Sequence, residues 1–244
     1  MPKPRPVALV TGGAHRVGRQ VALALAEAGY DLLIHYNRNK GEANKTAKQI
    51  AAHGGRALAV QADLTDPPAA ALTLGKAVAE QFGRLDVLVN NASIYEPRDL
   101  AGTDMAIMRR MWAVHVEAPL LLCQRFEKDL RSTRGHVVNM VDAMIERPWP
   151  KYLAYCASKA ALWNLTLSLA RELAPQITVN GIAPGVIQWP DDYPRAEREK
   201  YLRRVPLARA GTPRDAAGAV LFFCTTGSYV TGQILRLDGG RSLT

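Results

Sequence analysis

Residues 7–18 read VALVTGGAHRVG, a short apolar run that passes directly into a glycine turn. The run Val7–Thr11 has the length and composition of a buried strand. After the turn, apolar residues recur from Val17 to Ala28 at the spacing of one helix face, and Gly29 can end that helix. A strand, a glycine turn and a helix in this order aim free backbone N–H groups at a phosphate, although a glycine-rich turn alone can also be no more than a tight turn.

The rest of the chain alternates between apolar runs and helical patterns. Further strands are expected at residues 32–36, 57–61, 87–90, 136–141, 177–182 and 234–237. Helices are expected at residues 41–52, 68–82, 104–130 (with a kink at Pro119), 155–175 and 213–225, and a mobile flap with one short helix at 187–205. No linker rich in Gly, Ser or Pro divides the sequence. Residues 1–244 are therefore predicted to form a single doubly wound α/β domain of the Rossmann type.

Composition narrows the class of function. The chain has 244 residues, 48% of them hydrophobic, and a formal net charge of +9. Its Arg and Lys residues are scattered without interleaved aromatics, so nucleic acid is not an expected partner, and a polyanionic small ligand is the simpler use of the charge. No apolar run is long enough to cross a bilayer and no signal-peptide layout is present, so a cytoplasmic protein with no membrane partner is expected. The three cysteines are widely spaced, which predicts neither a disulfide framework nor a metal site.

The second strand ends in residues that favour one dinucleotide over another. In a doubly wound sheet the ligand lies at the carboxyl ends of the strands, and an acidic residue at this end holds the ribose 2′-hydroxyl of NAD. Here the strand end carries His35, Asn37 and Arg38 but no carboxylate. Because Arg38 would attract a 2′-phosphate, the sequence predicts NADP(H). Asp31, at the other end of this strand, is expected to be a solvated turn residue.

Polar or small residues also follow the other strands. Asp63 comes after the third strand, where it can meet the adenine edge or cap the next helix. The run Asn91-Ala92-Ser93 follows the fourth strand, and small polar residues there let a ligand approach the backbone closely. Asp142 follows the fifth strand and Pro184-Gly185 follows the sixth. Their shared location at one edge of the sheet predicts a common ligand crevice.

Tyr155 and Lys159 form a Tyr-x-x-x-Lys pair at the start of a helical pattern. Residues four apart on a helix lie on one face, so a phenol and an ammonium group are expected side by side. A neighbouring positive charge favours tyrosinate, and the spacing therefore predicts that Lys159 lowers the pKa of Tyr155 toward the range of a proton shuttle. On its own the pair is a weak motif, because Tyr and Lys fall four apart by chance at the edge of many amphipathic helices.

Over essentially the whole chain these features resemble the short-chain dehydrogenase/reductase family. The resemblance rests on Thr11-Gly12 with Gly18, Asp63, Asn90-Asn91-Ala92, Tyr155 with Lys159, Pro184-Gly185 and Asp238-Gly239-Gly240. It implies an open sheet of seven parallel strands, binding of a nicotinamide cofactor and a homotetramer.

Three positions depart from the general family pattern. Arg16 stands where a second glycine is usual, Asp142 where the catalytic serine is usual, and His115 where an active-site asparagine is usual. The first two, together with His35-x-x-Arg38 and the ending GGRSLT, are similar to the pteridine reductase subgroup, which carries a TGxxxRxG turn and Asp in place of Ser. His115 fits neither pattern, and this leaves open how the proton relay behind Lys159 is built.

The subgroup resemblance implies a role for each matching residue. Asp142, Tyr155 and Lys159 would be catalytic. The cofactor would be bound by Gly12, Arg16, Val17, Gly18, His35, Asn37, Arg38, Asp63, Leu64, Asn91, Ala92, Ser93, Tyr155, Lys159, Pro184 and Gly185. The substrate would be bound by Arg16, Ser93, Tyr95, Asp142, Tyr155 and Trp189, with Tyr95 stacking a pterin ring over the nicotinamide.

The chemistry of Asp142 favours a pterin over a ketone. An ionised carboxylate can only accept hydrogen bonds, so it would repel the alkoxide that forms when a carbonyl group is reduced. Reduction of a pterin C=N bond instead needs a proton on nitrogen, which a buried carboxyl group beside Tyr155 can pass. The leading hypothesis is an NADPH-dependent pteridine reductase acting on dihydrobiopterin, dihydromonapterin or dihydrofolate. The alternatives are a short-chain reductase of a sugar or acyl ketone, and an NADP-binding sensor without catalysis.

Overall fold

A computed structural model describes residues 4–189 and 192–244, and its strands form one parallel sheet. The order across the sheet is β3-β2-β1-β4-β5-β6-β7. The strands are β1 (Val7–Val10), β2 (Asp31–Tyr36), β3 (Ala57–Gln61), β4 (Val87–Asn90), β5 (His136–Met140), β6 (Thr178–Pro184) and β7 (Ile234–Leu237). Successive strands are added on one side of β1 as far as β3, and from β4 onward they are added on its other side. A doubly wound sheet binds its ligand at this switch point between β1 and β4. The predicted fold is confirmed.

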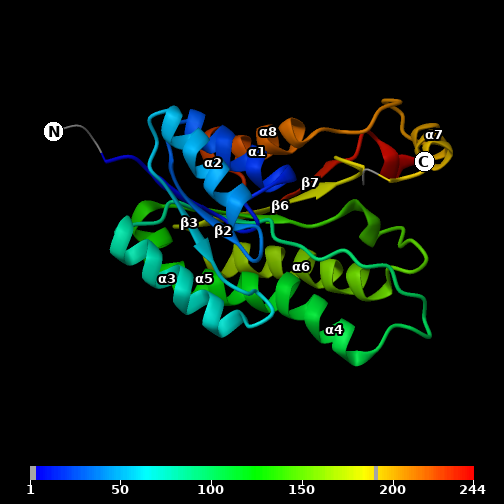
Figure 1. Ribbon diagram of the computed structural model, residues 1–244, viewed down its shortest axis with the longest axis horizontal. Helices are drawn as coiled ribbons and strands as arrows, with labels where there is room; N and C mark the ends of the chain where they lie inside the picture. The colour runs from blue at the N-terminus through cyan, green and yellow to red at the C-terminus, as the bar shows by residue number, and fades with distance from the viewer. Residues whose placement is uncertain (1–3, 190–191) are drawn as a thin grey trace.

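Helices cover both faces of the sheet (Figure 1). One face carries α1 (Arg16–Glu27), α2 (Lys40–Ala52) and α8 (Pro213–Leu221), and the other carries α3 (Pro67–Gln81), α4 (Met105–Trp112), α5 (Ala118–Thr133) and α6 (Leu153–Glu172). Along β1, Leu9 packs toward the α3 and α5 side, whereas Val10 packs toward α1 and α8. Strands buried on both faces need continuous apolar runs, which is why β1 reads VALV. The short helix α7 (Arg195–Leu202) lies within the predicted 187–205 segment.

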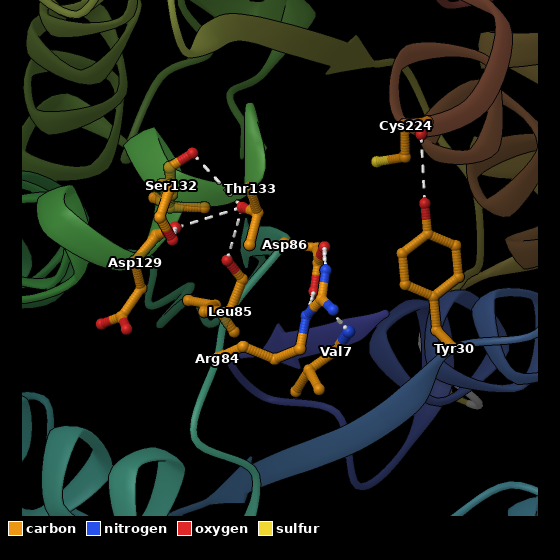
Figure 2. Close-up of polar contacts among 10 residues, drawn as sticks. Val7, Tyr30, Arg84, Leu85, Asp86, Asp129, Ser132, Thr133 and Cys224 are labelled. Carbon is orange, nitrogen blue, oxygen red and sulfur yellow. Dashed lines mark hydrogen bonds and ion pairs between the residues drawn. The ribbon is translucent and has the colours of Figure 1, made fainter. Parts of the chain in front are cut away.

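The amino ends of the strands are fastened together by polar side chains (Figure 2). The Asp86 carboxylate accepts a hydrogen bond from the Val7 N–H at 2.8 Å and two from the Arg84 guanidinium at 2.9 and 2.6 Å. The Thr133 hydroxyl, at the end of α5, donates to the Leu85 carbonyl at 2.9 Å. These bonds join β1, the segment before β4 and α5 at one end of the sheet, and the ligand crevice opens at the other.

Asp31 is not the solvated turn residue that the sequence predicted. It is the buried first residue of β2, it accepts a hydrogen bond from the Arg56 N–H at 2.9 Å, and it forms an ion pair with Arg5 at 3.1 Å. The physical reason is that β2 lies inside the sheet, where a carboxylate needs partners.

The helical pattern at residues 104–130 is interrupted by a π-helical turn, Ala113–Glu117, between α4 and α5. Pro119 is the second residue of α5, and its ring nitrogen cannot donate the usual helical hydrogen bond to the carbonyl four residues earlier. That carbonyl belongs to His115, and the wider π turn lies at this point. The predicted kink is therefore a π turn just before the proline. The turn carries His115 into the interior of the protein.

Candidate active site

A cleft of about 930 Å³ opens at the carboxyl ends of the strands. Its lining includes all but one of the site residues predicted from the sequence, namely Gly12, Arg16, Val17, Gly18, His35, Asn37, Arg38, Asp63, Asn91, Ala92, Ser93, Tyr95, Asp142, Tyr155, Lys159, Pro184, Gly185 and Trp189. The exception is Leu64, whose side chain is buried in the core cluster on the α3 side. Only the backbone of Leu64 is left for a contact with a ligand.

The glycine turn has no room for side chains. Gly12 has a φ of +64°, and a Cβ on Gly18 would lie 2.2 Å from the Gly12 carbonyl oxygen and 2.5 Å from Asn91 Nδ2. The Asn91 amide donates to the Thr11 carbonyl at 2.9 Å, so the end of β4 holds the turn in place. Backbone groups can therefore approach a phosphate closely, and the turn fits the diphosphate of a dinucleotide.

His35 braces this turn from inside the sheet. Its ring is buried, Nδ1 accepts the Gly12 N–H at 3.0 Å, and Nε2 lies 3.1 Å from the Ala62 carbonyl, to which it donates. Burial lowers the pKa of His35, which keeps the ring neutral and Nδ1 free to accept. Both ring nitrogens are engaged by the backbone, so His35 acts on a ligand through Gly12.

The end of β2 presents an exposed cation to the cleft. Within residues 4–189 and 192–244 the Arg38 guanidinium has neither a hydrogen bond nor an ion pair. Asn37 beside it donates to Asp63 at 3.3 Å. Asp63 also accepts the backbone N–H and the hydroxyl of Thr65, both at 2.9 Å, and the backbone bond is the main reason that its pKa is lowered. The N-cap of α3 is Asp66 instead, so Asp63 is a turn residue that faces the cleft.

Asp142 and Tyr155 form a hydrogen-bonded pair in the cleft. The Tyr155 hydroxyl donates to Asp142 Oδ2 at 2.6 Å, and Asp142 Oδ1 accepts the Met144 N–H at 2.7 Å. Burial raises the pKa of the Asp142 carboxyl, and the bonds from Tyr155 and Met144 oppose this only in part. A carboxyl group in this setting holds a proton at a higher pH than an ordinary aspartate.

The prediction that Lys159 lowers the pKa of Tyr155 is wrong for this arrangement. Burial and the charge of Asp142 raise the pKa of Tyr155 well above its usual value. The Lys159 ammonium instead donates to the Met140 carbonyl at 2.6 Å and lies 5.9 Å from the centre of the Tyr155 ring. Burial lowers the pKa of Lys159 itself to about 8. The phenol is therefore a neutral donor that is already committed to Asp142.

Aromatic side chains form much of the wall. Tyr95 stacks on Tyr152 with ring centroids 4.4 Å apart and meets the edge of Tyr155 at 4.9 Å. Trp189 packs against Tyr193 with ring centroids 4.9 Å apart. Of the four Trp and eight Tyr in the sequence, eight line the cleft: Tyr36, Tyr95, Trp149, Tyr152, Tyr155, Trp189, Tyr193 and Tyr201. Such a wall favours a flat ligand.

Sequence reasoning missed five of these aromatics as site residues, namely Tyr36, Trp149, Tyr152, Tyr193 and Tyr201. For the last four, the available signal was the density of Trp and Tyr in two segments, 149–155 and 189–201, of a chain that is only 7% aromatic as a whole. It could not be used without knowing that the two segments meet across the cleft.

Comparison with known proteins agrees with this geometry. A family model described as "Enoyl-(Acyl carrier protein) reductase" matches residues 12–242. Pteridine reductase 1 of Leishmania tarentolae is 35% identical, with 98% of this chain and 97% of the relative covered. The chain belongs to the short-chain dehydrogenase/reductase family. The chain is therefore an oxidoreductase, and this family uses a nicotinamide cofactor.

Two further relatives show how broad the similarity is. The 3-oxoacyl-acyl-carrier-protein reductase FabG of Staphylococcus aureus is also 35% identical, with 96% of each chain covered. The crystal structure of FolM, alternative dihydrofolate reductase 1 from Brucella canis complexed with NADP, superposes with a TM-score of 0.88 at 37% identity and covers 98% of this chain and 95% of its own. Overall similarity thus sets the family but not the substrate.

Among the described residues, no helix combines the length and the apolar character that crossing a bilayer requires.

Proposed function

We propose that this oxidoreductase is an NADPH-dependent pteridine reductase, which reduces the C=N bond of dihydropterins or dihydrofolate. The observation that carries the proposal is the half-buried Asp142 carboxyl, hydrogen-bonded to Tyr155 at 2.6 Å in an aromatic cleft. A carbonyl reductase would be served better by a hydroxyl donor at this position, because an ionised carboxylate repels a developing alkoxide.

The residues at the nucleotide end of the cleft fit NADPH, and residues 1–244 would form one NADP-binding domain. The turn at Gly12 and Gly18 would hold the diphosphate, and the cations Arg16 and Arg38 would meet phosphate oxygens. The end of β2 contributes the Arg38 cation and no carboxylate of its own, which supports NADPH over NADH. When bound, the cofactor supplies the hydride that is added to carbon.

In this reaction the protein's own side chains supply the proton that is added to the substrate nitrogen. Asp142 and Tyr155 together can hold two protons, and burial favours the form in which the carboxyl group is protonated. Both groups line the cleft and are hydrogen-bonded to each other, so a proton given by Tyr155 to a substrate nitrogen is replaced from Asp142. The buried ammonium group of Lys159 favours the negative charge that is left when the pair gives up a proton. It also donates a hydrogen bond to the Met140 carbonyl.

The aromatic wall would hold the ring. Tyr95 is 46% exposed although it stacks on Tyr152, so one face of its ring remains open to a planar ligand. Aromatic stacking contributes about 0.5–1.5 kcal/mol beyond burial. Trp189 and Tyr193 come from the 187–205 segment and would close over the distal end.

The experiment is NADPH oxidation by the purified protein with dihydrobiopterin, dihydrofolate and a small diketone as substrates. We expect turnover of a dihydropterin or dihydrofolate, and a loss of about 10²–10⁴-fold in the Asp142→Ser and Tyr155→Phe variants. If Asp142→Ser retains pterin reduction, the proton mechanism is wrong. Preferential reduction of the diketone would support the carbonyl reductase, and full turnover by Tyr155→Phe would support a protein that binds NADP without using this pair.

Assembly as a cytoplasmic homotetramer is part of the same proposal and is supported by family membership. Leu235 on the edge strand β7, Phe222 and Tyr229 are exposed large side chains of the kind that subunit contacts cover. Light scattering of the purified protein tests this.

A further inference from the structure

His115 is a buried polar side chain to which the proposed proton transfer gives no part. It lies on the π-helical turn between α4 and α5 and is only 1% exposed. Its ring meets the Tyr155 ring edge-on, with centroids 5.6 Å apart. A buried imidazole beside a catalytic pair needs hydrogen-bond partners, and those partners define its protonation.

Four contacts link His115 to the cleft on one side and to α6 on the other. Nε2 lies 2.9 Å from the Ser93 hydroxyl and accepts the Ile94 N–H at 3.3 Å. Nδ1 lies 2.8 Å from the Ser158 hydroxyl, which in turn donates to the Tyr155 carbonyl at 2.8 Å. The series ends on a carbonyl oxygen that cannot take up a proton, so it positions groups and is not a path for proton transfer.

Only one tautomer of the ring satisfies all four contacts. If Nδ1 carries the proton, Nδ1–H donates to Ser158, while bare Nε2 accepts from Ile94 and from the Ser93 hydroxyl. If Nε2 carried it, N–H would face the Ile94 N–H, and Ser158 would donate to Nδ1 and abandon the Tyr155 carbonyl. Burial, aided by the charge of Lys159, holds the pKa of His115 well below its usual value, so the doubly protonated ring is excluded as well.

This tautomer decides what Ser93 can do. The Ser93 hydroxyl has a single proton, and Nε2 at 2.9 Å is a nearer acceptor than its other neighbour, the Ile94 carbonyl at 3.4 Å. Hydroxyl donors bond best at about 2.5–3.0 Å, so the proton is directed to Nε2. The lone pairs of Ser93, which is exposed and lines the cleft, then face the ligand.

We propose that His115 is a positioning residue that holds Ser93 as a hydrogen-bond acceptor only, so that this wall of the cleft selects a ligand group bearing N–H over one bearing a carbonyl oxygen. The N–H is an amide or ring amine, from either the nicotinamide carboxamide or a nitrogen heterocycle bound as substrate. The inference deepens the proposed function and rests on it only in placing those ligands in this cleft.

The first test observes the protons directly and needs no turnover. Neutron diffraction from ligand-free crystals exchanged into D₂O should show a deuteron on His115 Nδ1, none on Nε2, and the Ser93 deuteroxyl pointing at Nε2. A deuteron on Nε2, or on both nitrogens, overturns the proposal whatever the enzyme reduces.

The second test identifies the source of the N–H. Ser93→Ala, a change at an exposed residue, is titrated with NADPH and with its reduced 3-acetylpyridine analogue, which has a methyl ketone in place of the carboxamide. If the cofactor is the source, the variant binds NADPH about tenfold more weakly and the analogue unchanged. If the substrate is the source, NADPH binding is unchanged and KM for a reducible pterin rises about tenfold, with a smaller change in kcat.

Three outcomes count against the proposal and are distinguishable from failure of the proposed function. Changes of less than about twofold in every titration and in KM mean that Ser93 accepts no bond from either ligand. An equal loss for NADPH and the acetylpyridine analogue means that Ser93 does not distinguish N–H from carbonyl. In the third, Ser93→Ala has identified the cofactor as the source of the N–H, yet His115→Leu, which frees the Ser93 hydroxyl to donate, leaves the preference for NADPH over the analogue unchanged. A protein that binds NADPH but reduces no pterin would refute the proposed function alone, because the neutron and cofactor results would still hold.

Discussion

Replacing Arg16 with glycine should stabilise the protein while weakening its hold on NADPH. Arg16 is the first residue of α1 and has a φ of +51°, in the left-handed region. That conformation costs a residue with a Cβ roughly 1–2 kcal/mol. Glycine removes this cost but loses about 0.5–1 kcal/mol through the greater freedom of the unfolded chain. The net expectation is a gain of about 0.5 kcal/mol, because the exposed Arg16 side chain has no hydrogen bond or ion pair among the described residues that would be lost.

The effect on the ligand has the opposite sign. A guanidinium that meets a phosphate forms charge-assisted hydrogen bonds, each contributing about 1.5–3 kcal/mol. Loss of one such bond weakens NADPH binding by about tenfold to a hundredfold. The strained conformation of Arg16 lies in the wall of the cleft, where a contact with a ligand can offset its cost.

Calorimetry of the ligand-free protein and fluorescence titration with NADPH measure the two effects separately. The melting temperature should rise by about 1–2 °C in Arg16→Gly, as 1 kcal/mol corresponds to about 2–4 °C in a domain of this size. Arg134→Gly is the matched control, because Arg134 has a φ of +52° at the end of α5 and does not line the cleft. It should stabilise the protein and leave NADPH binding unchanged. A lower melting temperature for Arg16→Gly, or an unchanged NADPH affinity, would refute the reasoning.

Three other substitutions test separate parts of the molecule. Arg38→Ala should weaken NADPH binding by about tenfold to a hundredfold and NADH binding by less than about threefold, as measured by titration; equal losses would contradict a 2′-phosphate contact. Asp142→Asn should raise the free energy of unfolding at pH 7 but not at pH 3. The native pKa of Asp142 is raised above 3.8, so the unfolded chain ionises first as pH rises and the wild type loses stability from about pH 4 upward. Denaturant titrations at both pH values check this, and a gain at pH 3 of equal size would contradict it. Asp86→Ala should lower the free energy of unfolding by about 2 kcal/mol, since it leaves Arg84 and the Val7 N–H without their acceptor, with no change in NADPH affinity.

The fold could be predicted because its determinants are local in the sequence. Apolar runs such as VALV, glycine turns and helix periodicities each identify an element, and alternation of the elements implies the parallel sheet. The π turn at Ala113–Glu117 could not be predicted, because nothing in its composition differs from that of an ordinary helix. The burial of Asp31 is not predictable for a related reason. Its partners Arg5 and Arg56 are brought to it by neighbouring segments of the fold.

The site was predicted as a set of residues but not as a set of contacts. The rule that ligands lie at the carboxyl ends of strands gathered nearly all of the cleft-lining candidates without any knowledge of their distances. Which charge Tyr155 faces depends on side-chain directions. Helix spacing put Lys159 beside it, yet its hydroxyl turns to Asp142, thirteen residues earlier in the chain, and Lys159 turns to Met140.

A comparison of two carboxyl groups in the same cleft explains why Asp142, and not Asp238, is suited to carry a proton. Burial acts to raise the pKa of both. At Asp238 the hydrogen bonds donated by Ser242 and Gly240 outweigh burial, and its pKa is lowered, so that group stays ionised and fastens the chain around it. At Asp142 one backbone N–H and the phenol do not outweigh burial. A further donor would stabilise the carboxylate and the fold together, but it would also remove the proton that C=N reduction requires. The proposed proton transfer therefore requires that Asp142 accept few hydrogen bonds, because only then does its pKa stay raised.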